Sequence, residues 1–162
     1  RFVLQTGDTV SGSPEFWGVA KIQAHFDFLK NYGIFADGSA MRLGVELAAS
    51  GAWVGQVSLY NFDAQNRRCD IGYALMRAHW GRGYIGEALA ALLQFGFDTL
   101  DLHRVEADID PRNDASRRAV ERLGFKEEGL LRERWLVNGE VCDTVFYGLL
   151  RREWLSRQDH PR

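Results

Sequence analysis

The stretch Ile71–Leu93, IGYALMRAHWGRGYIGEALAALL, predicts a strand, a glycine-rich turn and a helix in direct succession. Ile71, Tyr73 and Leu75 alternate with smaller residues, as along a half-buried strand. One face of the following helix carries Leu89, Leu92, Leu93, Gly96, Phe97 and Leu100. Because glycines allow close backbone approach and a helix N-terminus attracts anions, the turn predicts a pyrophosphate-binding site. The same pattern also fits an ordinary tight turn before a core helix.

Two other nucleotide-binding motifs do not fit this turn. A Walker loop requires Gly-Lys-Ser/Thr at the start of the helix, where the chain has Gly86–Ala88, Gly-Glu-Ala. A dinucleotide fingerprint requires three spaced glycines after the first strand of a repeating fold, and the sequence shows no such repeat.

The segment Trp80–Ile85 resembles motif A of the GNAT superfamily of acetyl-CoA-dependent N-acetyltransferases, whose pattern is Arg/Gln-x-x-Gly-x-Gly/Ala. Tryptophan holds the first position here. Ile85 holds the last, with Gly86 one place later. The longer string His79–Tyr84, followed by Glu87–Leu89, resembles the branch that contains the ribosomal-protein N-terminal acetyltransferases.

A second segment resembles motif B of the same superfamily, Asn-x-x-Ser followed about seven residues later by Gly-Phe. Asn113 and Ser116 lie one helical turn apart, so both can face one ligand, and Gly124–Phe125 completes the pattern. Asn113 also fits a plain helix cap, and Ser116 a surface hydroxyl. Many GNAT enzymes carry a tyrosine where this chain has Val120. The resemblance therefore implies Ser116 as the acid for the departing thiolate, with Tyr147 as a weaker candidate.

The resemblance covers about Met41 to Leu150 and implies transfer of an acetyl group from acetyl-CoA to a primary amine by direct attack. The implied acetyl-CoA site consists of Leu75, Met76, Gly81, Arg82, Gly83, Tyr84, Ile85, Gly86, Glu87, Asn113 and Ser116. Backbone N–H groups near Leu75 and Met76 are the expected donors to the oxyanion. The acceptor stays open between a protein N-terminus and a small amine such as a polyamine, an amino acid or an aminoglycoside. A non-catalytic acyl-CoA-binding sensor is the alternative from another class.

The attacking amine must be neutral, so a carboxylate or a water chain leading to one has to take its proton. Glu106 is the first choice and Asp108 the next, because both lie on the polar side of a predicted strand. Glu133 is a further candidate, with Glu46 and Asp70 as fallbacks. Each of these residues also fits a solvated charge on a sheet face.

The remaining pattern predicts an α+β (mixed α/β) fold, and the resemblance implies the GNAT arrangement of it. That arrangement is a central mixed, mostly antiparallel sheet flanked by helices and splayed between its fourth and fifth strands. The expected strands are Phe2–Gln5, Ala40–Ala48, Val54–Tyr60, Ile71–Leu75, His103–Ile109, Phe125–Val137 and Glu140–Leu150, the last two joined by an Asn138-Gly139 hairpin turn. The further expected helices are Pro14–Asn31 and the segment between Asn113 and Gly124. A polar, frayed tail is expected over Arg151–Arg162.

Composition narrows the class further. With 162 residues and 46% apolar content, residues 1–162 are expected to form a single acetyltransferase domain. The net charge of −2 argues against an overall positive surface for binding nucleic acid. The sequence contains no apolar stretch long enough to predict a membrane segment. Cys69 and Cys142 lack CxxC spacing, which indicates a reducing cytoplasm. The four histidines lack ligand spacing, so no metal is expected. We expect a monomer or a homodimer. Because the chain begins at Arg1 rather than at methionine, we also expect a trimmed natural start.

Overall fold

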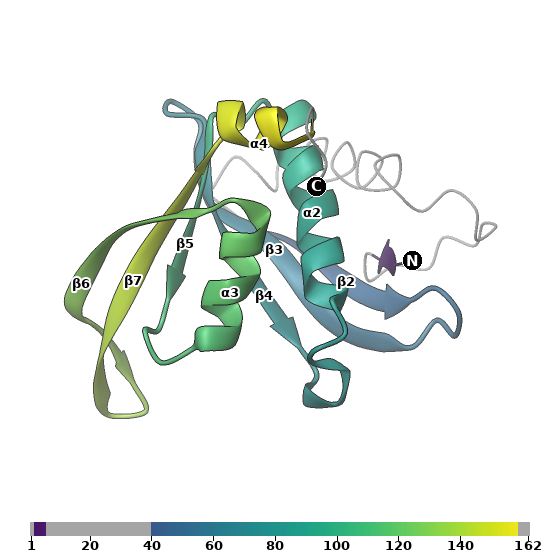
Figure 1. Cartoon of the computed structure of the whole chain (residues 1–162), viewed down its shortest axis with the longest axis horizontal. Coiled ribbons are helices and arrows are strands. Elements are labelled where there is room, and N and C mark those ends of the chain that lie inside the picture. Colours follow the sequence, from purple (N-terminus) through teal and green to yellow (C-terminus); the bar gives the residue numbers. More distant parts are fainter. Residues whose placement is uncertain (1, 6–39, 159–162) are drawn as a thin grey trace.

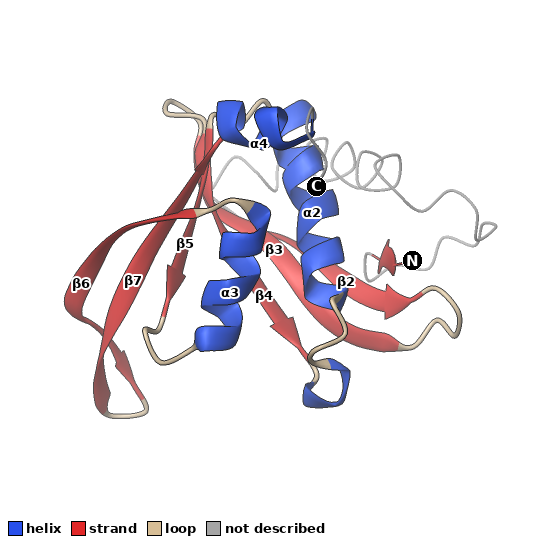
Figure 2. Cartoon of the chain, in the orientation of Figure 1, coloured by secondary structure: helices blue, strands red, loops and turns tan. Residues whose placement is uncertain are grey.

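The computed structural model describes residues 2–5 and 40–158, and these contain seven strands in one sheet (Figures 1 and 2). The strand order is β1-β2-β3-β4-β5-β7-β6. The β4–β5 pair is parallel, and the other neighbouring pairs are antiparallel, which confirms the predicted mixed, mostly antiparallel sheet. The strands are β1 (Phe2–Gln5), β2 (Met41–Leu47), β3 (Trp53–Asp63), β4 (Arg68–Leu75), β5 (Arg104–Ile109), β6 (Lys126–Val137) and β7 (Glu140–Leu150). The predicted helix over residues 14–31 lies outside the described residues.

Helices α2 (Tyr84–Asp98) and α3 (Asp114–Leu123) lie over the same face of this sheet (Figure 1). The buried side chains of that face form the core: Met41, Leu43, Val45, Val57, Leu59, Ile71, Val105, Ala107, Val145 and Leu149. An apolar residue of α3 would be expected to face this core, but Ala115 is exposed, whereas Val120 is fully buried. Ala115 precedes Ser116 by 100° around the helix, which turns it away from the buried side.

The opposite face of the sheet is polar around β4 and β5. On β5, Val105, Ala107 and Ile109 are buried toward the helices, while Glu106 and Asp108 are half-buried on the other side. This alternation confirms the period-2 pattern predicted for the strand.

The β4–β5 pairing is short. It consists of the pairs Arg68–Arg104, Cys69–Val105 and Asp70–Glu106. Beyond Asp70, β4 continues to pair with β3, and beyond Glu106, β5 continues to pair with β7. We call the place where the two strands part the β4–β5 divergence. It confirms the splay expected between the fourth and fifth strands.

The C-terminal prediction is wrong for the described residues, because Arg151–Gln158 forms helix α4 rather than a frayed tail. Trp154 is only 7% exposed, and its ring stacks on Phe97 at a centroid distance of 6.1 Å. The Glu153 carboxylate accepts from the Leu150 N–H at 3.1 Å at the start of the helix. A single buried tryptophan in a polar stretch gives no periodic apolar pattern from which a helix could be predicted. The helix depends instead on tertiary packing.

Strand β3 extends beyond the predicted end at Tyr60. Asn61 adopts a φ of 52°, and the pairing with β4 becomes irregular between Tyr60 and Asp63. The polar residues Asn61–Asp63 are thus a bulged continuation of the strand, and a turn follows at residues 64–67.

Candidate active site

The glycine-rich turn leads from β4 into α2 through the short 3-10 helix η2 (Arg77–His79). Gly81 and Gly83 have φ angles of 73° and 80°, a conformation that other residues rarely adopt. A methyl group added at either glycine, or at Gly86, would meet nothing within 4 Å. The predicted turn is therefore confirmed, and its glycines border open space.

The two helix N-termini on this side differ in their capping. The first-turn N–H groups of Ile85 and Gly86 have no acceptor within the helix, and the Gly83 cap supplies no side-chain acceptor for them. By contrast, Asn113 caps α3, its Oδ1 accepting from the Ser116 N–H at 3.1 Å. The start of α2 is thus the more suitable place for a phosphate.

Two backbone groups at the end of β4 are already engaged. The Met76 N–H donates to the Val54 carbonyl at 2.8 Å, which disfavours Met76 as an oxyanion donor. The Trp80 indole donates to the Leu75 carbonyl at 2.7 Å and folds the turn back on the strand. Since N–H directions alternate along a strand, the Leu75 N–H points away from β3, toward the divergence.

Tyr73 links the divergence to α3. Its hydroxyl donates to the Ser116 carbonyl at 3.2 Å, and burial raises the pKa of the phenol. Ser116 is half-buried, and a hydrogen bond from its side chain partly offsets the effect of burial on the pKa of Tyr73. The structure therefore brings Tyr73, Asn113 and Ser116 together. The sequence singled out only the last two as site residues, although a phenol at an apolar strand position usually indicates a buried partner.

Tyr147 has a different role. The side chain is fully buried on β7, and its hydroxyl accepts from Arg117 Nε at 3.2 Å and donates to Glu121 at 3.0 Å. Burial raises the pKa of this phenol. Two of its partners lie on α3, and a third, the Glu127 carboxylate at 3.4 Å, lies on β6. This arrangement favours Tyr147 as an anchor between these elements over an acid at the site.

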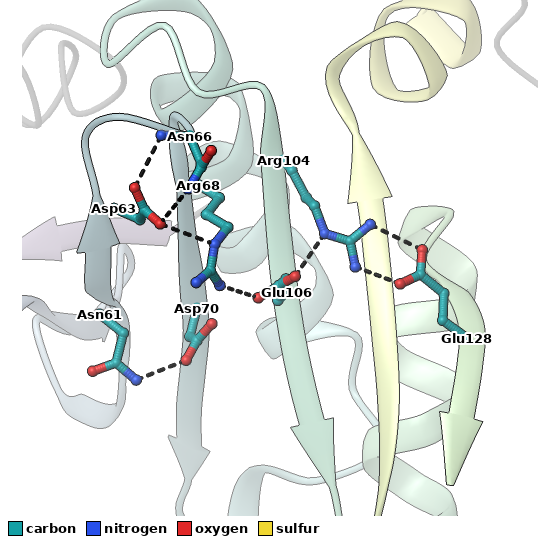
Figure 3. A network of polar contacts seen from close by, with 8 residues as sticks. All are labelled: Asn61, Asp63, Asn66, Arg68, Asp70, Arg104, Glu106 and Glu128. Carbon is teal, nitrogen blue, oxygen red and sulfur yellow. Dashed lines mark hydrogen bonds and ion pairs between the residues drawn. The ribbon is translucent and has the colours of Figure 1, made fainter. Parts of the chain in front are cut away.

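Glu106 lies inside a chain of ion pairs on the polar face of the sheet (Figure 3). Its two carboxylate oxygens accept from Arg68 Nη1 and Arg104 Nε, both at 2.7 Å. Arg104 also binds Glu128 on β6 through its two terminal nitrogens. With both oxygens held by guanidinium groups, Glu106 is poorly placed to take a proton from an amine.

Two other carboxylates border the divergence on this polar face. Burial raises the pKa of Asp70, although a hydrogen bond from Asn61 at 2.7 Å opposes the shift. Asp108 accepts from the Trp135 indole at 3.1 Å, a contact that crosses from β5 to β6 and that no local pattern predicts.

Glu133 lies in an irregular part of β6, with a φ of 53° and an exposed side chain. Its backbone N–H donates to the Asp143 carboxylate at 2.7 Å. These contacts fix the hairpin locally and bring Glu133 to none of the other candidates.

Within residues 2–5 and 40–158, no group of three His, Cys, Asp or Glu residues is arranged to hold a metal ion. None of the helices described is long and apolar enough to cross a membrane.

The diverging sheet and the glycine turn beside it define an α+β domain of the acyltransferase type. The chain belongs to the family described as "Acetyltransferase (GNAT) domain", which matches residues 11–126. It is 39% identical over 120 residues to the "Putative ribosomal N-acetyltransferase YdaF" of Bacillus subtilis, covering 74% of this chain and 64% of that protein. It is 36% identical over 118 residues to the "Uncharacterized N-acetyltransferase p20" of Bacillus licheniformis, covering 73% and 66%. The chain thus spans just under two thirds of the length of these two curated relatives.

Among solved structures, the spermidine N-acetyltransferase of Vibrio cholerae in complex with CoA and spermine superimposes with a TM-score of 0.69. Sequence identity is 25%, and the match covers 82% of this chain and 77% of that one.

Proposed function

We propose that this protein transfers the acetyl group of acetyl-CoA to a primary amine by direct attack. The observation that carries the proposal is the β4–β5 divergence, together with the nearby N-terminus of α2, where the Gly83 cap supplies no side-chain hydrogen bond. A sheet already parted there can take a narrow chain between its strands, and the helix start favours a phosphate. Family membership and the CoA complex of the Vibrio cholerae enzyme support the same ligand.

The acetyl-CoA site we propose starts with the turn. The first-turn N–H groups of α2, with those of the preceding glycine segment, would bind the phosphates, so the residues concerned are Gly81, Arg82, Gly83, Tyr84, Ile85 and Gly86. The Glu87 N–H already donates to the Gly83 carbonyl at 3.2 Å. The Leu75 N–H and the Asn113 side-chain amide would hold the arm that leads to the thioester. The open space at Gly81, Gly83 and Gly86 fits this use of the turn.

Bound acetyl-CoA supplies an activated acetyl thioester. The protein has to accept a proton from the amine and to stabilise the departing thiolate. We assign proton acceptance to Asp70 in place of Glu106, because Asp70 borders the divergence and burial raises its pKa toward the range useful for a base. Ser116 remains our candidate for a hydrogen bond to the departing thiolate.

For the acceptor, we propose a protein N-terminal amine such as that of a ribosomal protein, acetylated in the cytoplasm. The support is the similarity to YdaF and, over 53% of this chain at 33% identity, to the "[Ribosomal protein uS5]-alanine N-acetyltransferase" of Escherichia coli. A small amine is the second candidate, favoured by the similarity to the spermidine enzyme.

Thiol release from acetyl-CoA, measured with N-terminal peptides, spermidine and free amino acids, tests the proposal. We expect transfer to at least one class of amine, with a preference for peptides beginning with Ser or Ala. Calorimetric binding of CoA without transfer to any amine would instead indicate a non-catalytic acyl-CoA sensor. Absence of CoA binding would refute the site itself.

A further inference from the structure

Tyr73 is a phenol at the point where β4 has left β5. It lies three residues beyond Asp70, the last β4 residue that pairs with β5. Its side chain is on the helix face, because it pairs in register with the buried Val57. The hydroxyl reaches the Ser116 carbonyl at 3.2 Å, so the side chain extends from the sheet to the first turn of α3.

This hydrogen bond can be exchanged for another. In an α-helix the Ser116 carbonyl also accepts from the N–H of Val120, four residues later. A carbonyl oxygen has two lone pairs, so losing the Tyr73 contact leaves it satisfied. The hydroxyl can therefore turn to a second acceptor without leaving a buried group unpaired.

Neither of the other neighbouring side chains can supply a phenol at this point. Tyr147 is held by Arg117 and Glu121. Val120 is apolar and fully buried one turn after Ser116. In the described part of the chain, Tyr73 is thus the phenol available between β4 and α3.

Building on the proposed acetyl transfer, we propose that Tyr73 is a catalytic residue whose hydroxyl turns from the Ser116 carbonyl to the sulfur of the leaving thiolate. The bond from the amine nitrogen to the acetyl carbon forms, and the bond from that carbon to sulfur breaks. Sulfur takes the Tyr73 proton, and the phenolate regains a proton from solvent. The amine gives its own proton to Asp70 or water. Burial keeps the phenol protonated at neutral pH.

A binding experiment tests the contact with sulfur without relying on turnover. Calorimetry would compare CoA with desulfo-CoA, which lacks only the sulfur atom, on the wild type and on Tyr73→Phe. We expect the wild type to prefer CoA by about threefold or more, the effect of one hydrogen bond, and Tyr73→Phe to lose that preference. An equal loss of affinity for both ligands, with a lower Tm, would show that Tyr73 only tethers α3.

Kinetics supply the second test. We expect Tyr73→Phe to lower kcat by about 10²-fold, with the KM for acetyl-CoA nearly unchanged, since the contact strengthens in the transition state. An unchanged kcat in Tyr73→Phe would overturn the inference. If the wild type acetylates no amine, the proposed function fails, and the desulfo-CoA comparison still decides whether Tyr73 contacts sulfur.

Discussion

Ser116 is a residue whose backbone and hydroxyl have separate roles. Its N–H completes the cap by Asn113, and its carbonyl accepts from Tyr73, so Ser116→Ala keeps both contacts. We expect kcat to fall by about tenfold, or 1.4 kcal/mol, with little change in the KM for acetyl-CoA. Tm should stay the same or rise slightly, because alanine favours a helix. Full kcat in this variant would reduce Ser116 to a helix residue.

Asp70 should show opposite effects on stability and activity. Its folded-state pKa is raised above the unfolded value, so the folded state binds the proton more tightly. The ionised carboxylate therefore lowers the free energy of unfolding at pH 7, and this effect disappears as the pH falls through the raised pKa to the unfolded value of about 3.9. Asp70→Asn should thus be more stable than the wild type at pH 7 and equally stable near pH 3, since Asn61 keeps an acceptor.

The same substitution should lower kcat/KM if Asp70 accepts the proton from the amine. Urea denaturation at the two pH values and steady-state kinetics measure the two effects independently. Glu106→Gln is the comparison: it removes one charged partner from each of two guanidinium groups, so stability should fall more than activity. The reverse pattern, activity lost in Glu106→Gln and kept in Asp70→Asn, would restore Glu106 as the base.

At the scale of elements, the sequence predicted those turns and helix caps that depend on a few neighbouring residues. Asn138 and Gly139 both adopt the positive φ that the hairpin turn requires, at 52° and 82°. Asn113 caps its helix through contacts within one turn. The ion pair between Arg104 and Glu106 joins two side chains of β5. The ion pair between Arg104 and Glu128 reaches β6, and it could not be predicted because the strand order is known only from the fold. Helix α4 depends likewise on the packing of Trp154 against α2.

Helix α2 offers a test of the phosphate site through Gly86. A Cβ there meets nothing within 4 Å, and the backbone is helical, so Gly86→Val should fold with a nearly unchanged Tm. The added side chain would occupy the space expected for the phosphates, so CoA affinity should fall at least about tenfold, or 1.4 kcal/mol. Gly129→Val on β6, also free of contacts, is the matched control. Equal CoA affinity for both variants, measured by calorimetry, would contradict the site.

At the scale of the whole molecule, an ion-pair chain crosses the sheet from β4 to β6 (Figure 3). Arg104 and Glu128 meet over Gly148 on β7, where an added Cβ would come within 2.6 Å of both side chains. Gly148→Ala should therefore displace the pair and lower the free energy of unfolding by roughly 1 kcal/mol. In an Arg104→Ala background the same change should be milder. Additive effects in this double-mutant cycle would show that Gly148 is required for another reason.

The short β4–β5 pairing has a mechanical consequence. The sheet consists of two parts, β1 to β4 and β5 to β7, which are joined by only three residue pairs between β4 and β5. The ion pair between Arg68 on β4 and Glu106 on β5 links the two parts within the short segment where the strands still pair. Beyond that segment, a ligand that enters the β4–β5 divergence breaks no hydrogen bond between these two strands. The free energy of its contacts is then available for affinity and orientation, because the opening exists before the ligand arrives.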